Sequence, residues 1–201
     1  MMWLSSWRLL PARPPAIVIT PLVRVLVALG LTPTTLSFLG VAGNIGAAVL
    51  IATGDLVAGG IVTLFASALD MLDGALARAT GQDSKAGAML DSVLDRISEA
   101  VVLCGIVAYS LMRDNDEHAM LGFVAVVGSL LVSYVRARAE GLGIALTDGL
   151  FTRAERVALT SAALILGWLG PALWLLAVLT SLTAAQRLTI AMRKLQEGPP
   201  A

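Results

Sequence analysis

The sequence predicts an all-α fold, that of a polytopic membrane protein with six transmembrane helices and an N-terminal interfacial amphipathic helix. Of its 201 residues, 57% are hydrophobic and 14% are charged, and the mean hydropathy is +0.84. Soluble domains carry about 25% charged residues, so this composition excludes an ordinary soluble protein. The apolar residues also gather into six stretches, each close to the roughly 20 residues that a transmembrane helix needs.

The N-terminal segment, residues 1–32, is expected to lie in the membrane interface. Arg8, Arg13 and Arg24 interrupt its apolar residues, together with several prolines. Such interruption is typical of an amphipathic segment that lies on a membrane, and not of a helix that spans one.

Turn signals separate the six predicted spans. A six-helix transmembrane domain is expected over residues 33–195, followed by a short tail over residues 196–201. The last break, Gly170-Pro171, is short, so the final two spans are expected to form a hairpin. The predicted spans are residues 34–52, 56–79, 86–112, 119–140, 153–169 and 171–188.

Basic residues fall almost entirely on one side of the predicted spans, and only Arg113 lies in a loop on the other side. Cytoplasmic loops carry the excess of Lys and Arg, so both termini are expected in the cytoplasm of a multi-pass cell-membrane protein. The single cysteine, Cys104, allows no internal disulfide, and no nucleic-acid partner is expected. The basic residues on or near the cytoplasmic side are Arg78, Lys85, Arg96, Arg136, Arg138, Arg153, Arg156, Arg187, Arg193 and Lys194.

Four aspartates interrupt the second and third spans. Asp70 and Asp73 are three residues apart, and Asp91 and Asp95 are four residues apart, so each pair shares one face of its helix. Asp73 and Asp91 are about equally far from the loop between the two spans, roughly 13 Å at 1.5 Å per residue. We therefore expect the two pairs to meet at one depth, in the cytoplasmic half of the membrane.

These acidic residues require positive charge nearby. An aspartate inside the bilayer costs roughly 2.5–3.5 kcal/mol, and four of them repel one another. Mg²⁺, Mn²⁺ or Ca²⁺ suits an all-oxygen site. Four carboxylates can hold two ions, which stabilise both the attacking and the leaving oxygen of a phosphoryl displacement. If three aspartates hold metal, the fourth can take a proton from a hydroxyl nucleophile.

Two other interpretations would also explain the four aspartates. One is an intramembrane network of salt bridges without chemistry, which four acids at matched depth make the weaker explanation. The other is a divalent-cation transporter. Transport sites tend to lie near the membrane midplane on broken helices of repeated halves, whereas these acids lie toward the cytoplasm and no repeat is visible.

The stretch that contains the aspartates resembles the signature of the CDP-alcohol phosphotransferase family. Every fixed position and every gap of that signature is present, and a further aspartate stands three residues upstream, as it does in the family. The resemblance extends over nearly the whole chain. The matching residues are Asp70, Asp73, Gly74, Ala77, Arg78, Gly87, Asp91 and Asp95.

The resemblance implies an enzyme, active as a homodimer, that moves a phosphatidyl-type group from a CDP-linked lipid to an alcohol and releases CMP. It implies that Asp70, Asp73 and Asp91 are the principal ligands of two Mg²⁺ or Mn²⁺ ions. Asp95 resembles the general base and is also a candidate ligand of the second metal. The implied CDP-lipid contacts are Pro33, Thr34, Ser37, Gly74, Ala77, Arg78 and Gly87.

The first three of those contacts belong to a proline-led cap before the first span. Thr34 stands where the family usually has Asn or Asp, and Ser37 where it usually has Thr. Both keep a hydroxyl group. Helix capping by Thr34 or Thr32 would also explain the pattern without any role in binding.

A second patch, residues 133–156, concerns the acceptor. Arginine binds phosphate in a bidentate manner, so an acceptor with its own phosphate would need arginines here, although contacts with lipid headgroups would also explain them. The patch resembles that of the phosphatidylinositol-phosphate synthases within the family, except that Thr152 stands where Glu is common. The resemblance implies Arg136, Arg156 and Arg187 as ligands of the acceptor phosphate. Arg153 is a further candidate, because it lies at the cytoplasmic end of its predicted span, on the side of the metals.

This second resemblance implies CDP-diacylglycerol and inositol 1-phosphate as substrates, with phosphatidylinositol phosphate and CMP as products. A phosphatidylglycerophosphate synthase is the alternative within the family, because its acceptor also carries a phosphate. Whether the lipid is diacyl or an archaeal ether lipid stays open.

Overall fold

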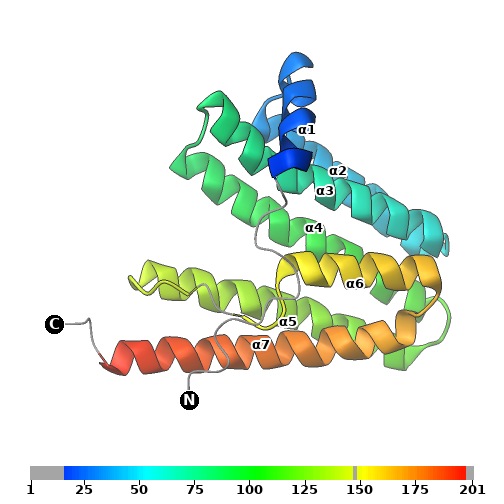
Figure 1. Ribbon diagram of the computed structural model, residues 1–201. Coiled ribbons are helices and arrows are strands. Elements are labelled where there is room, and N and C mark those ends of the chain that lie inside the picture. The colour runs from blue at the N-terminus through cyan, green and yellow to red at the C-terminus, as the bar shows by residue number, and fades with distance from the viewer. Residues whose placement is uncertain (1–15, 147–148, 198–201) are drawn as a thin grey trace.

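The computed structural model describes residues 16–146 and 149–197 and consists there of seven α-helices without strands (Figure 1). The all-α prediction is thereby confirmed. Arg8 and Arg13 of the predicted interfacial segment, and most of the predicted tail, lie outside the described residues. The helices are α1 (Ala16–Ala28), α2 (Pro33–Thr53), α3 (Leu56–Thr80), α4 (Lys85–Leu111), α5 (Asp116–Gly141), α6 (Arg153–Leu166) and α7 (Leu169–Glu197).

Helix α2 begins with a threonine–proline cap. Thr32 is the N-cap, and its hydroxyl oxygen accepts a hydrogen bond from the backbone N–H of Thr35 at 3.2 Å. Pro33 occupies the first helical position, where a backbone N–H would have no partner within the helix. Thr34 is therefore not the cap, and its exposed side chain is available to the neighbouring pocket.

A short loop turns the chain between α3 and α4. Gly81 ends α3 in the left-handed conformation, with φ at 64°, which glycine adopts without the steric cost of a Cβ. Ser84 starts α4, because its hydroxyl oxygen accepts a hydrogen bond from the N–H of Gly87 at 3.0 Å. The two acidic helices therefore run antiparallel, as predicted.

Six of the helices form a closed ring in the order α3, α2, α4, α5, α7 and α6, which returns to α3. Helix α1 packs on α3 and lies steeply across the end of the bundle (Figure 1). Small residues allow close approach within the ring. A Cβ added to Gly43 would lie 2.8 Å from the Cβ of Ala66. One added to Gly105 would lie 2.7 Å from the backbone oxygen of Ala48.

The main apolar core joins α4, α5, α6 and α7 in the part of the bundle away from the α3–α4 loop. Ile106, Leu164 and Leu173 belong to it and are 1% exposed or less. Within a membrane such side chains are not transferred from water, so their close packing contributes through van der Waals contact. The bundle is thus fixed by apolar packing in this part.

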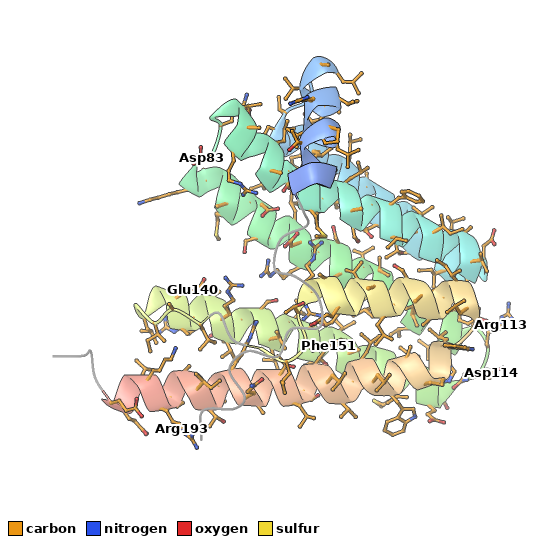
Figure 2. All side chains as sticks on the ribbon, in the orientation of Figure 1. Asp83, Arg113, Asp114, Glu140, Phe151 and Arg193 are labelled. Atoms are coloured by element: carbon orange, nitrogen blue, oxygen red, sulfur yellow. The ribbon has the colours of Figure 1, made fainter. Side chains whose placement is uncertain are left out.

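Large apolar side chains cover the outside of the bundle. Phe65 and Phe123 are 68% and 58% exposed, whereas charged residues collect at the two ends. Figure 2 shows Asp83 and Arg193 at one end and Arg113 at the other. Helices α2, α3, α5 and α7 are long and apolar enough to cross a membrane. The chain is therefore a membrane protein.

Six spans are thus not confirmed, because α4 and α6 do not meet the same criteria. Helix α4 has 27 residues, but they include Asp91, Asp95 and Glu99. Helix α6 has only 14 residues, fewer than the roughly 20 that a perpendicular span needs.

The predicted break at Gly170-Pro171 is wrong. Gly167 ends α6 in the left-handed conformation, with φ at 74°, and α7 begins at Leu169. Proline is tolerated in the first turn of a helix, so Pro171 lies inside α7. This helix continues to Glu197, beyond the predicted end at residue 188.

Candidate active site

Three of the four aspartates lie together between α3 and α4. Asp70, Asp91 and Asp95 each offer an oxygen within 4.8 Å of the others. Asp70 is 2% exposed, and the other two are half-buried. The second acidic pair and Asp70 of the first pair therefore come together, while Asp73 lies outside this set. An all-oxygen set of this kind is what Mg²⁺ and Mn²⁺ prefer.

The fourth aspartate, Asp73, is hydrogen-bonded to α2 and to its own helix. Its Oδ2 accepts a hydrogen bond from the hydroxyl of Ser37 at 2.5 Å, and its Oδ1 accepts one from the backbone N–H of Gly74. Asp73 also lines a pocket together with Asp91. It thus connects the carboxylate cluster to the adjoining pocket.

That pocket opens between α2, α3 and α4, beside the carboxylates, and encloses about 800 Å³ including space open to solvent. A Cβ on Gly74 would meet only the guanidinium of Arg78 within 4 Å, so the glycine leaves the wall open. Gln82, Asp83 and Ser84 of the loop also contribute to the wall and were not predicted. The pocket brings together all seven predicted CDP-lipid contacts: Pro33, Thr34, Ser37, Gly74, Ala77, Arg78 and Gly87.

Arg153, the first residue of α6, reaches the carboxylate cluster. One terminal nitrogen lies 2.5 Å from Oδ2 of Asp70 and the other 2.7 Å from Oδ1 of Asp95. The start of α6 is fixed by a capping box, in which the N–H of Thr152 donates to Oε2 of Glu155 at 2.6 Å. Thr152, which stands where Glu was expected, is thus the N-cap of the helix that begins with Arg153.

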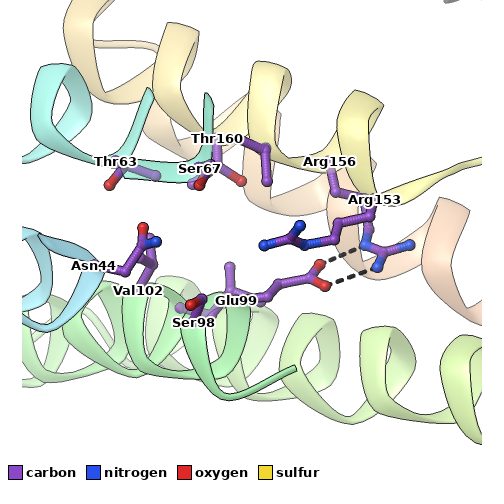
Figure 3. Close-up of a pocket in the computed structure, with 11 residues that line it drawn as sticks. Asn44, Thr63, Ser67, Ser98, Glu99, Val102, Arg153, Arg156 and Thr160 are labelled. Carbon is purple, nitrogen blue, oxygen red and sulfur yellow. Dashed lines mark hydrogen bonds and ion pairs between the residues drawn. The ribbon is translucent and has the colours of Figure 1, made fainter. Parts of the chain in front are cut away.

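Arg156, one turn further along α6, pairs with Glu99 of α4 (Figure 3). Its Nε and one terminal nitrogen donate to the two oxygens of Glu99, the second at 2.7 Å. Glu99 was not among the predicted site residues. Its place in the sequence could have indicated a role, because Glu99 is a charged residue within an apolar run. It also follows Asp95 by four residues and therefore lies on the same face of the helix.

The remaining two predicted arginines lie apart from this pair. The side chain of Arg136 is 45% exposed, and its Nε donates to Glu140 at 2.8 Å. Arg187 is buried, and it donates to the backbone oxygen of Val132 at 2.8 Å. The structure therefore does not gather the four predicted acceptor-phosphate ligands into one open cluster.

The family model for CDP-alcohol phosphatidyltransferases matches residues 30–186. The chain belongs to this family and is therefore a transferase enzyme of phospholipid synthesis, as the motif predicted.

The chain is similar to phosphatidylinositol phosphate synthases and to an archaetidylinositol phosphate synthase. The chain is 37% identical over 180 residues to phosphatidylinositol phosphate synthase of Mycobacterium tuberculosis. The matched region covers 84% of this chain and 83% of that protein. The chain is also 36% identical over 176 residues to archaetidylinositol phosphate synthase of Pyrococcus horikoshii, covering 87% and 91%.

Two crystal structures of the Mycobacterium tuberculosis phosphatidylinositol phosphate synthase have the same fold. The form with CDP-DAG bound matches with a TM-score of 0.80 and 33% identity, over 88% of this chain and 94% of that chain. The complex with manganese and citrate matches with a TM-score of 0.79 and 33% identity, over 87% and 88%.

Proposed function

We propose that this enzyme transfers a phosphatidyl group from CDP-diacylglycerol to inositol 1-phosphate, forming phosphatidylinositol phosphate and releasing CMP. One observation carries the proposal: the pocket with the predicted CDP-lipid contacts adjoins the carboxylate cluster, and Asp91 belongs to both. The relatives support the substrates, because the mycobacterial phosphatidylinositol phosphate synthase holds CDP-DAG in its crystal structure.

Asp70, Asp73, Asp91 and Asp95 are the proposed ligands of two Mg²⁺ or Mn²⁺ ions. The residues fit such ions, since all the donors are carboxylate oxygens. In addition, Oδ1 of Asp70 is buried and has no hydrogen-bond partner among the described residues. When bound, the ions would neutralise the pyrophosphate and stabilise the attacking and leaving oxygens of the displacement.

The other side chains of the site have separate proposed roles. Arg78 offers its charge to the pyrophosphate, while Gly74 and Gly87 leave room for the nucleotide. Asp95 takes the proton of the acceptor hydroxyl as that oxygen attacks the phosphorus next to diacylglycerol. The bond from this phosphorus to the bridging oxygen breaks, and CMP leaves with that oxygen.

The phosphate of the acceptor is proposed to bind at the neighbouring arginines. Arg136 and Arg187 are proposed ligands, and so is Arg153, whose guanidinium contacts Asp70 and Asp95. Sequence resemblance also names Arg156, although its guanidinium is already paired with Glu99. A bidentate arginine contact suits a phosphate monoester and would give an uncharged acceptor such as free inositol no advantage.

CMP release tests the reaction directly. The purified enzyme is given CDP-diacylglycerol and Mg²⁺ or Mn²⁺, with inositol 1-phosphate, free inositol or glycerol 3-phosphate in turn. We expect CMP with inositol 1-phosphate only. CMP with glycerol 3-phosphate alone would identify a phosphatidylglycerophosphate synthase, and no CMP with any acceptor would refute the proposed reaction.

The membrane arrangement is proposed to be six spans within residues 33–195, an interfacial segment over residues 1–32 and a tail over residues 196–201. Both termini and the active site then face the cytoplasm, and the enzyme is a homodimer. The support is the distribution of charge at the described helix ends. Arg78, Lys85, Arg136, Arg138, Arg193 and Lys194 lie toward one end of the bundle, and Arg113 lies at the other.

Two measurements test this arrangement. A fluorescent protein fused to the C-terminus is expected to be active, whereas a periplasmic alkaline phosphatase fused there is not. Native mass spectrometry in mild detergent is expected to give twice the mass of one chain. An active phosphatase fusion would reverse the orientation, and a single-chain mass would refute the dimer.

A further inference from the structure

Arg187 of α7 is buried between two other parts of the chain, and it is 6% exposed. One terminal nitrogen of its guanidinium donates to the backbone oxygen of Val132 on α5 at 2.8 Å. The opposite edge of the guanidinium faces Gly149, which lies between α5 and α6. A helix backbone and a loop glycine therefore enclose the charged group.

The contact with Gly149 leaves no room for a side chain. A Cβ added to Gly149 would lie 2.7 Å from the second terminal nitrogen of Arg187, 2.8 Å from its Nε and 3.1 Å from the carbon that joins them. The two nitrogens are nearer than the carbon, so this Cβ would press on the edge of the guanidinium that carries them. Atoms cannot stay this close, and one of the two residues would have to move.

The loop next to Gly149 is held in place. The backbone N–H of Leu150 donates to Oε1 of Gln186, the residue before Arg187, at 3.3 Å. Phe151 is 4% exposed and belongs to the main apolar core. The guanidinium, by contrast, is the end of a flexible side chain. A larger residue at position 149 is therefore expected to displace Arg187 and not the loop.

We propose that Gly149 is a positioning residue for Arg187. The missing side chain lets the guanidinium lie between Val132 and the loop, in the position from which it binds the acceptor phosphate. Arginine binds phosphate through a fork of fixed geometry, so a displaced guanidinium loses contacts although it keeps its charge. The inference rests on the proposed function, in which Arg187 is a ligand of that phosphate. Neither the signature nor the resemblance around the arginines assigns a role to Gly149.

The test begins with Gly149→Ala. This variant is expected to raise the KM for inositol 1-phosphate roughly tenfold, as loss of a hydrogen bond to a charged group does. The KM for CDP-diacylglycerol should stay within about twofold. Gly141→Ala, at the end of α5, is the matched control, because a Cβ there meets nothing within 4 Å. An unchanged KM for inositol 1-phosphate in Gly149→Ala, or an equal rise for both substrates, would overturn the proposal.

A double-mutant cycle shows whether Gly149 acts through Arg187. In an Arg187→Ala background the side chain that the new Cβ would displace is gone. Gly149→Ala is then expected to change the KM for inositol 1-phosphate by less than about twofold, since effects that pass through one contact are not additive. A strain in the loop backbone would persist in this background. A further tenfold rise there would therefore count against positioning of Arg187.

Thermal unfolding in detergent runs the same cycle without activity. Gly149→Ala is expected to lower Tm by about 2–4 °C, because the displaced guanidinium loses its hydrogen bond to Val132. No such loss is expected in the Arg187→Ala background. An equal fall in Tm in both backgrounds would show that Gly149 does not act through Arg187.

Failure of the proposed function gives a different result. If the unmodified enzyme releases CMP with glycerol 3-phosphate alone, the proposed acceptor is wrong, and the kinetic cycle is run with glycerol 3-phosphate, which also carries a phosphate. If no acceptor gives CMP, the proposed reaction is wrong. The Tm cycle then still decides whether Gly149 sets the position of Arg187.

Discussion

The hydroxyl of Ser37 donates a hydrogen bond of 2.5 Å to Oδ2 of Asp73, which links the N-terminal part of α2 to the first acidic pair, on α3. Both side chains are 4% exposed. The same two residues line the pocket beside the carboxylate cluster. The bond therefore couples the wall of the proposed CDP-lipid site to one of its proposed metal ligands.

Ser37→Ala is expected to raise the KM for CDP-diacylglycerol about tenfold, since a hydrogen bond to a charged group contributes about 1.5–3 kcal/mol. Ser37→Thr keeps the hydroxyl and is the matched control. Steady-state CMP release with varied CDP-diacylglycerol measures both. The same KM in the alanine and threonine variants would show that the hydroxyl has no role in binding.

Asp95→Asn is expected to lower kcat by about 100-fold or more, because proton transfer by a positioned base contributes roughly 10²–10⁴-fold. Binding of CDP-diacylglycerol should persist, since Asp95 does not line the pocket of Asp73 and Asp91. Single-turnover kinetics and a titration with CDP-diacylglycerol measure the two effects separately. If the variant instead loses Mn²⁺ as completely as Asp91→Asn does, Asp95 is mainly a ligand.

Removal of divalent ions with a chelator is expected to abolish CMP release, and Mn²⁺ or Mg²⁺ to restore it. Asp70→Asn and Asp91→Asn should each weaken Mn²⁺ binding at least tenfold, because each removes one charged oxygen donor. Asp55→Asn, at the opposite end of α3, is the matched control. Equal Mn²⁺ affinity in all three variants would place the metals elsewhere.

Gly105→Ala is expected to destabilise the protein by about 1–3 kcal/mol, as overpacking does. Its Cβ would lie 2.7 Å from the backbone oxygen of Ala48, so a helix must shift. Gly46→Ala is the control on α2, since a Cβ there meets nothing within 4 Å. It should be neutral or stabilising by up to about 1 kcal/mol. Thermal unfolding in detergent measures both, and equal Tm values would contradict the close approach of α2 and α4.

Local spacing was sufficient to predict the pocket and the acidic cluster. Helical periodicity decides which side chains share a face, and the short loop around Gly81 sets two such faces against each other. Thus Asp70, Asp91 and Asp95 could be expected to meet, and Gly74 to line the pocket beside them, without knowledge of the rest of the fold.

The arginine partners could not be predicted in the same way. Glu99 and Arg156 are separated by 57 residues, and their pairing depends on the order in which six helices close into a ring. The end of α6 was also ambiguous, because Gly167 and Gly170 are both plausible stops. The left-handed backbone at Gly167 decides between them, and this is a property of the folded chain.

The shortness of α6 has a consequence for how the reactants arrive. Its 14 residues cover about 21 Å, against a hydrocarbon core of about 30 Å, and it starts inside the bundle instead of at its rim (Figure 1). If α6 runs along the membrane normal, its start at Arg153, beside the proposed metal site, lies below the level of the lipid headgroups. A lipid donor can enter sideways with its tails still in the bilayer, whereas a soluble sugar phosphate must descend and shed part of its water.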